Sequence, residues 1–255
     1  MEALRSYGLL LRWQLLRMRR QLAMLFVIQV ALAMGIVYGL SFLLPRIDPR
    51  SALFLATGAP TVTLLILGLN VVPQEVSQGK LTGRTAYINA LPVPRLAPPA
   101  ADVTFWLLAQ LPGTLLALVV ASLRFHFALH MNAAVVPAIV LVALTGAAVG
   151  YGLAMALRPE IAQQAGSFVA ILILLFSPIN FPADRLPTVL QLVHDVLPIQ
   201  YMADLVRWSL TGVRDGSLTL SFAVVIAWCL GGIAMAPANT EPPEPERSHL
   251  SVAEA

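Results

Sequence analysis

The chain has 255 residues, of which 58% are hydrophobic and only 11% are charged, and its mean hydropathy is +0.79. Soluble domains are about half apolar and about a quarter charged, so this composition excludes an ordinary soluble domain and indicates a protein that crosses the membrane several times. The net charge of +3 is carried almost wholly by arginine, and the single cysteine, Cys229, excludes a disulfide framework and a cysteine metal site.

The first 21 residues, "MEALRSYGLLLRWQLLRMRRQ", form a basic arm. At 3.6 residues per turn Arg5, Arg12 and Arg19 fall on one stripe, while mostly apolar side chains fall on the opposite side. This pattern predicts an amphipathic helix at the membrane surface, with its arginines directed toward lipid phosphates. The alternative is a charged flank that serves only as a topology signal.

Six apolar stretches are long enough to be membrane spans, since a helix needs about 20 residues to cross the hydrocarbon core. They cover about residues 22–44, 52–72, 103–123, 133–157, 161–177 and 218–235. A small-residue motif at Ala31–Ala33 resembles a signal-peptide cleavage site, but the apolar run continues far beyond it, so we expect a retained span. Residues 1–236 are therefore expected to form one transmembrane domain, followed by a disordered tail at 237–255.

The arginines and the single lysine also predict the orientation of these spans. Ten of them fall on the side that holds both termini and the loop between the second and third spans, and six fall on the other side. Because cytoplasmic loops carry the excess of Lys and Arg, both termini are expected to be cytoplasmic.

The loop between the second and third spans, residues 73–102, is too long for a simple connection. It predicts a polar helix from Glu75 to about Ala90, which Pro92, Pro94, Pro98 and Pro99 would end. We expect Glu75 and Arg84 to be exposed on this helix, and the helix itself to be gripped by another protein.

The fifth apolar run ends in the stretch "SPINFPADRLP", and residues 178–216 then alternate between apolar and charged positions. Apolar residues recur at helical spacing on both sides of Pro198, but each half is too short to span. Broken backbone is tolerated at membrane depth only where protein or water satisfies it. Two short re-entrant helices in the outer leaflet are therefore predicted before the last span.

Several catalytic features are missing from the sequence. It contains neither a G-x-x-x-x-G-K-[ST] phosphate loop nor an H-E-x-x-H zinc motif. None of the six span centres holds an ionisable residue of the kind that relays a coupling ion, so the energy for any transport is expected to come from a partner. Ser167 as an intramembrane protease nucleophile would need a nearby histidine, and a packing role is the alternative.

Among the polar residues within the spans, we single out Gln29, Asn70, Gln110, Thr114 and Tyr151. They could line a pathway through the membrane, or they could form hydrogen bonds between helices. The sequence leaves both interpretations open.

The order of these features resembles the membrane subunit of type-2 ABC transporters. Its late signature matches Pro178, Phe181, Pro182, Pro187, Pro198, Tyr201, Arg207 and Gly212. In the loop after the second span, Glu75, Gly79, Leu81, Pro92, Val93 and Arg95 match in order, whereas Lys80–Gly83 depart from the family's usual threonine, leucine and glutamate.

The resemblance implies an all-α permease in a bacterial cell membrane that works with a separate cytoplasmic ATPase and with a second copy or a related permease. ATP and Mg would bind to the ATPase, no cofactor is expected on this chain, and nucleic acid is not an expected partner. The residues implied for the ATPase-coupling helix are Glu75, Gly79, Lys80, Leu81 and Arg84.

The chain resembles the daunorubicin-type drug-resistance branch more than the polysaccharide branch, which implies export of an amphipathic drug or antibiotic. Export of a lipid or polysaccharide is the alternative substrate class. A non-transporting scaffold subunit and an ion-coupled secondary transporter remain as different functions.

Overall fold

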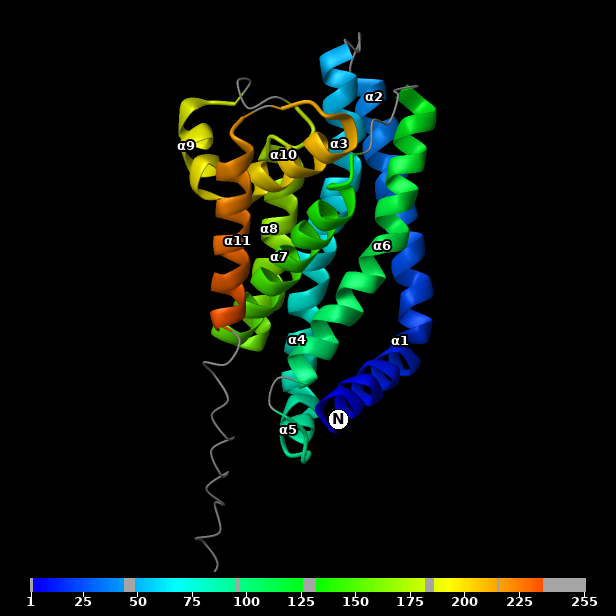
Figure 1. The fold of residues 1–255 in the computed structure, drawn as a ribbon, viewed down its shortest axis with the longest axis vertical. Helices are drawn as coiled ribbons and strands as arrows, with labels where there is room; N and C mark the ends of the chain where they lie inside the picture. The colour runs from blue at the N-terminus through cyan, green and yellow to red at the C-terminus, as the bar shows by residue number, and fades with distance from the viewer. Residues whose placement is uncertain are drawn as a thin grey trace, which may run out of the picture.

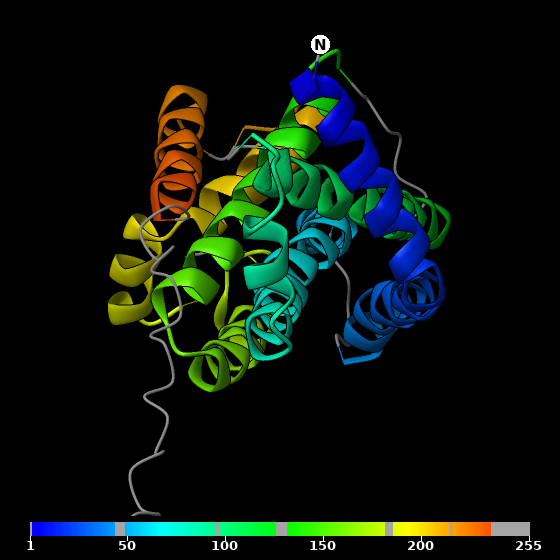
Figure 2. The ribbon, with the colours of Figure 1, turned by 90° about the horizontal axis from the view of Figure 1, so that it is seen from below.

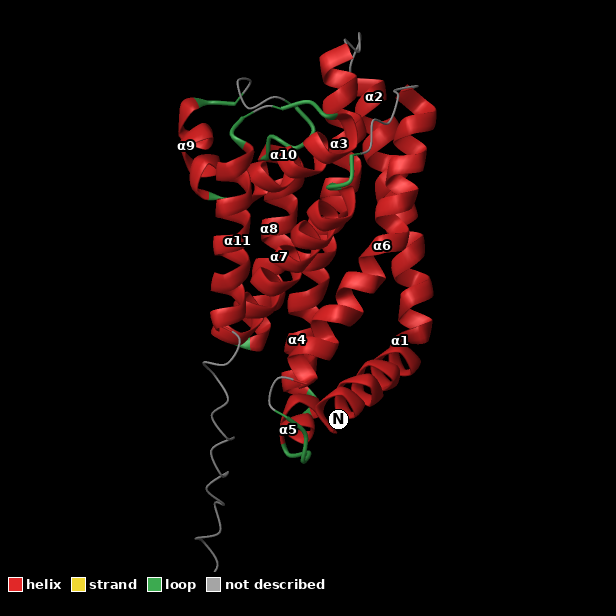
Figure 3. Cartoon of the chain, viewed as in Figure 1, coloured by secondary structure: helices red, strands yellow, loops and turns green. Residues whose placement is uncertain are grey.

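The computed structural model describes residues 2–43, 49–94, 97–125, 132–181, 186–214 and 216–235, and in these residues the regular secondary structure is entirely helical (Figures 1 and 3). Six helical segments of this part are long and apolar enough to cross a membrane: Leu4–Gly39, Ser51–Leu81, Ala97–Phe125, Val135–Ala156, Pro159–Phe176 and Leu218–Met235. The predicted all-α membrane fold with six spans is confirmed. The tail from residue 237 lies outside the described residues.

The N-terminal arm and the first span form one helix. α1 runs over Glu2–Met34 and continues through the π-helical turn η1, Gly35–Gly39, into the short α2, Leu40–Leu43. No Gly or Pro occurs between Leu9 and Met34, so nothing in the sequence ends the helix where the basic arm meets the span. Figure 1 shows that α1 bends instead, and residues 2–21 are called the N-terminal limb below.

The second span is longer than expected. α3, Pro49–Ile66, passes through the π-helical turn η2, Leu67–Val71, into α4, Val72–Leu81, with helical backbone at both junctions. Pro73 lies in the first turn of α4, after the widened turn, where its missing N–H costs little. Residues 49–81 therefore make one continuous rod.

The predicted single helix from Glu75 to about Ala90 is wrong. Its first part is the end of the rod, and its second part is the separate helix α5, Arg84–Asn89. The break is at Gly83, whose φ of 72° lies in the left-handed region that glycine adopts without strain. We call residues 75–89 the elbow.

The next three helices agree with the predicted spans to within a few residues: α6, Ala97–Phe125, α7, Val135–Ala156, and α8, Pro159–Phe176. The largest difference is at the start of α6. Pro98 and Pro99, expected to end the preceding helix, lie instead in the first turn of α6, where missing N–H groups have no helical partner to lose.

Two short helices separate α8 from α11, Leu218–Met235, as predicted. α9, Thr188–Val196, and α10, Pro198–Thr211, meet at the extended residue Leu197. Figure 1 shows both helices at the end of the bundle opposite the elbow, where α10 crosses over the spans. Gly212, at φ 73°, ends α10.

Small residues allow the central helices to approach closely. A Cβ on Gly150 of α7 would lie 2.0 Å from the carbonyl oxygen of Gly68 in η2, and one on Gly232 of α11 would lie 2.5 Å from the carbonyl carbon of Ala148. α7 thus packs backbone to backbone with the rod and with α11, as helices do in membranes. α1 packs mainly on α6, and Figure 2 shows α1 and α11 on opposite flanks of the bundle.

Candidate functional site

The elbow folds back on itself through Arg84. The turn at Thr82–Gly83 returns the Arg84 side chain over α4, where Nη2 donates a hydrogen bond to the backbone carbonyl of Glu75 at 2.8 Å. Arg84 Nη1 also lies 3.9 Å from Glu75 Oε2, and Arg17 Nη2 of the N-terminal limb lies 3.7 Å from the same oxygen. Only 20% of the Glu75 side chain and 22% of the Arg84 side chain are exposed, so the expected exposed polar helix is corrected to a charge clamp.

Gly79 makes room for this clamp. A Cβ at position 79 would lie 2.4 Å from Arg84 Nη2, so any larger residue would displace the guanidinium. Lys80 turns away from the elbow, and its Nζ donates hydrogen bonds to the carbonyls of Ala154 at 2.8 Å and Met155 at 3.3 Å, near the C-terminal end of α7. Lys80 thus ties the rod to α7, as a cation does at a helix C-terminus.

Two large side chains of the elbow, Leu81 and Tyr87, are exposed, and we call the part that carries them its tip. Leu81 is 53% exposed and Tyr87 is 66% exposed, and Thr82 and Gly83 between them are exposed as well. Tyr87 was not singled out from the sequence, although an aromatic residue within a polar loop helix is a usable signal. An exposed apolar pair on a rigid charged base is suited to contact another protein.

The N-terminal limb is fastened to the bundle through the face opposite its arginine stripe. Tyr7 Oη donates a hydrogen bond to Thr104 Oγ1 at 2.9 Å, Gln14 bonds to the Asp102 carboxylate, and Met18 is buried. The Asp102 carboxylate also interacts electrostatically with Arg17 and Arg84. Two acids, Glu75 and Asp102, and two arginines therefore interact at the base of the elbow. Arg5, Arg12 and Arg19 are exposed.

The second group of predicted residues lies at the opposite end, around Arg207 of α10. Arg207 is 1% exposed, and its Nη1 bonds to Asp204 Oδ1 at 2.8 Å and its Nη2 to the carbonyl of Ile179 at 3.2 Å. Its guanidinium carbon lies 3.8 Å from the centroid of the Phe54 ring of α3. Arg207 therefore joins α10, the turn after α8 and the rod.

The other residues of the late signature shape the backbone around Arg207. Pro198 starts α10, Gly212 ends it, Pro187 precedes α9, and Pro178 is buried beside Ile179 while Phe181 is half-buried. Pro182, together with Asp184 and Arg185, lies outside the described residues.

Tyr201 joins the two short helices through its phenol, whose Oη donates to the Asp195 carbonyl at 2.8 Å. Burial, followed by the carboxylates of Asp195 and Asp204, raises the pKa of Tyr201, which keeps this donor protonated. Tyr201 therefore helps to hold α10 against α9.

A comparison with models of protein families assigns the chain to a family. The profile of the ABC-2 type transporter family matches residues 5–211, which include the N-terminal limb, the elbow and α10. The chain belongs to the ABC-2 type transporter family. It is a permease subunit of an ABC transporter, a membrane protein whose family works with an ATPase partner. A comparison with curated proteins gives no match.

The polar residues inside the spans of this ABC-2 permease differ in their bonding. Asn70 Oδ1 accepts from Gln74, Gln74 Nε2 in turn lies 3.4 Å from Ser167 Oγ, and Ser167 Oγ donates to the Gln163 carbonyl at 3.2 Å. Through its contact with Gln74, Ser167 takes part in the packing of α8 against α4. Of the four histidines only His194 lies in the described residues, in α9, where its Nδ1 is 2.8 Å from the Leu190 carbonyl.

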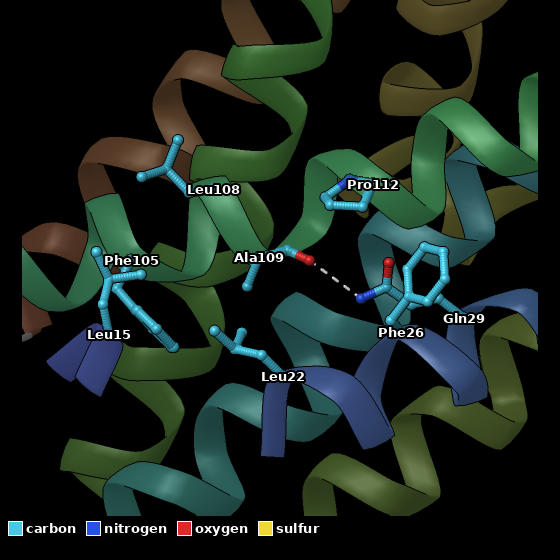
Figure 4. A pocket seen from close by; sticks show the side chains of 8 residues that line it. All are labelled: Leu15, Leu22, Phe26, Gln29, Phe105, Leu108, Ala109 and Pro112. Atoms are coloured by element: carbon cyan, nitrogen blue, oxygen red, sulfur yellow. Dashed lines mark hydrogen bonds between the residues drawn. The ribbon is translucent and has the colours of Figure 1, made fainter. Parts of the chain in front are cut away.

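Gln29 lies at a groove between α1 and α6 of the permease. Its Nε2 donates to the Ala109 carbonyl at 3.1 Å (Figure 4). The groove has a volume of about 170 Å³ and is lined by Leu15, Leu22, Phe26, Gln29, Phe105, Leu108, Ala109 and Pro112. We call it the α1–α6 groove.

Proposed function

We propose that this permease exports an amphipathic drug or antibiotic from a bacterial cell, driven by ATP that a separate cytoplasmic subunit binds with Mg. The observation that carries the proposal is the elbow: an exposed pair, Leu81 and Tyr87, on a base clamped by Arg17, Glu75 and Arg84. A partner that binds this tip would move the elbow as one unit, because the clamp holds it to the N-terminal limb. We propose that the ATPase is that partner and that the elbow end of the bundle is cytoplasmic.

The rod gives such a movement a path through the membrane. Residues 49–81 are helical without interruption, and Phe54, near the far end, is stacked under Arg207 of α10. Closure of the ATPase would thus tilt the rod and shift α10 and α9, and we propose that substrate leaves near these two helices. Net transport also requires an enclosed path, which we propose forms between this chain and a second copy or a related permease.

Three features support export of an amphiphile. The Lys and Arg excess lies on the elbow side, which favours a cytoplasmic elbow. The span walls are aliphatic, and the groove beside Gln29 combines apolar walls with one amide. Arg5, Arg12 and Arg19 form an exposed stripe that we propose rests on lipid phosphates.

The experiment is a transport assay in inside-out vesicles that contain the permease with its ATPase, using daunorubicin as the probe. We expect uptake that needs ATP and survives a proton uncoupler. A Walker-lysine substitution in the ATPase is the control and should abolish uptake. Uptake that follows the proton gradient and ignores ATP would show an ion-coupled transporter, and normal drug efflux in cells without the gene would show a scaffold.

A further inference from the structure

The N-terminal limb exposes one face of mixed character, which we call its outer face. Its exposed side chains are four arginines and three large apolar residues: Arg5, Arg12, Arg19, Arg20, Leu9, Trp13 and Leu16. The opposite face is held against the bundle, where Gln14 and Met18 are 5% and 1% exposed. The described part of the chain therefore leaves the outer face uncovered, although Leu9 and Leu16 on it are 59% and 58% exposed.

The charge of the limb has a single sign. Residues 3–21 contain five arginines and no Asp, Glu or Lys. Clusters of about four to eight basic residues directly beside a span, or on an amphipathic helix, attract anionic phospholipids. The outer face is thus complementary in charge to an anionic membrane surface.

The position of the limb favours lipid over a soluble protein as the partner of this face. The limb is the first part of α1, whose later residues form a span, so it begins at the membrane surface. Figure 2 shows the limb along one edge of the bundle. At this depth leucine and tryptophan side chains enter the acyl region while guanidinium groups reach the phosphates, a combination that water on all sides would not stabilise.

The same helical turns also reach the clamp at the base of the elbow. The guanidinium carbon of Arg17 lies 5.4 Å from the centroid of the Trp13 ring, within the range of a cation–π contact. Arg17 Nη2 lies 3.7 Å from Glu75 Oε2 on the other side. Arg17 therefore links the outer face, through Trp13, to the elbow.

We propose that the outer face of the limb binds the phosphate groups of anionic phospholipids in preference to zwitterionic ones, and that this contact holds Arg17 in the clamp and orders the elbow. The inference goes beyond a limb that rests on phosphates in general, because it names a lipid class and gives that lipid control over the elbow. The consequence for transport rests on the proposed function, whereas the binding and the ordering do not.

The first measurement is the quenching of Trp13 fluorescence in the full chain, reconstituted in equal amounts of phosphatidylglycerol and phosphatidylcholine. One of the two lipids at a time carries brominated acyl chains, and the Trp13 signal is the difference between the unmodified chain and Trp13→Phe. Phosphatidylglycerol should be enriched about fivefold or more beside Trp13, which is the factor expected for one arginine near an anionic surface.

Substitutions of arginine identify the source of this preference. The triple variant Arg5→Gln/Arg12→Gln/Arg19→Gln should equalise quenching by the two lipids, and Arg12→Gln alone should lower the preference if the triple variant inserts poorly. Arg158→Gln is the matched control, because Arg158 is exposed between α7 and α8, outside the limb, and the preference should persist. Equal quenching by both lipids in the unmodified chain would reduce the arginines to a topology signal. Quenching by neither lipid would place a protein on the outer face, and either result would overturn the inference.

The second measurement tests the link to the elbow by hydrogen–deuterium exchange of the full chain. Amides of α5 should exchange several-fold more slowly in vesicles that contain phosphatidylglycerol than in phosphatidylcholine alone. Arg17→Gln should remove this difference and keep the quenching preference, because Arg17 contributes the contact with Glu75. Exchange of α5 that ignores the lipid in the unmodified chain would overturn the control of the elbow by lipid.

Both measurements are independent of the export assay, since neither needs the ATPase or turnover. Their failure would leave ATP-driven export standing without control by lipid. A failed export assay with an intact lipid preference would remove the proposed function and leave an anionic-lipid site on the chain.

Discussion

The guanidinium of Arg207 lies over the ring of Phe54, with 3.8 Å between the guanidinium carbon and the ring centroid. Phe54 belongs to the rod of residues 49–81, whose other end carries Glu75 and the elbow. The two groups of signature residues, at opposite ends of the bundle, are thus joined by one helix. This continuity makes each group testable through its effect on the other.

Replacement of Arg207 should lower the stability of the folded permease. Arg207→Ala removes a buried guanidinium whose Nη1 lies 2.8 Å from Asp204 Oδ1, and breaking a buried ion pair costs about 3–5 kcal/mol. Arg207→Lys keeps the charge but loses the planar stacking on Phe54, so a smaller loss is expected. Thermal unfolding of the purified permease measures both, and the control is Arg214→Ala, an exposed arginine shortly after α10. Equal melting temperatures for the Arg207→Ala and Arg214→Ala variants would contradict the anchoring role.

Glu75 should respond differently to neutralisation and to charge reversal. Glu75→Gln keeps the hydrogen bond from Arg84, because that bond is accepted by the backbone carbonyl, and should reduce coupled transport only slightly. Glu75→Arg places a third cation beside Arg17 and Arg84 and should uncouple ATP hydrolysis from transport several-fold, in assays of both rates in proteoliposomes.

The Arg17→Glu/Glu75→Arg double variant should recover part of this coupling, because it restores one opposite-charge pair. The matched control is Glu160→Arg, an exposed reversal in the first turn of α8. If Glu160→Arg uncoupled as strongly as Glu75→Arg, a general charge effect would explain the loss, and the clamp would have no special role.

Sequence patterns predicted the elements of the fold that depend on local properties of the chain. The six spans follow from apolar length, and α9 and α10 follow from helical spacing around Pro198. The helix of residues 75–90 was wrong because its boundaries depend on context. Pro73 is harmless after a π-helical turn, and Gly83 ends the rod through a backbone angle that the amino-acid type permits but does not impose.

Most residues of the candidate site could be selected from the sequence, whereas the contacts between them could not. Glu75 and Arg84 were selected together with Gly79, which makes room for Arg84, and the two charged residues do meet. They form a clamp whose third member, Arg17, is 58 positions away from Glu75 in the chain. Pairing across such a distance has no periodicity in the sequence. The bond of Lys80 to α7 was missed for the same reason, since it depends on where another helix ends.

The close packing of α7 against the rod leaves no room for a side chain at position 150. A Cβ there would lie 2.0 Å from the Gly68 carbonyl oxygen, which is backbone and cannot rotate away, so Gly150→Ala should lower the melting temperature by several degrees or prevent folding. Gly231→Ala is the matched control, because a Cβ at that exposed helical position meets nothing within 4 Å. Alanine there should be neutral or stabilising by up to about 1 kcal/mol. Similar destabilisation by both substitutions would show that the close packing is not responsible.

The tip of the elbow should control assembly with the ATPase without affecting the fold. Tyr87 is 66% exposed and Leu81 is 53% exposed, so neither contributes much to the interior, whereas aromatic and apolar side chains at an interface centre carry much of its binding energy. Tyr87→Ala should weaken co-purification of the ATPase by about tenfold or more, with an unchanged melting temperature. Val136→Ala is the matched control, since Val136 is also an exposed large apolar residue, 69% exposed in the first turn of α7. Full recovery of the ATPase with the Tyr87→Ala and Leu81→Ala variants together would place the docking surface away from the elbow.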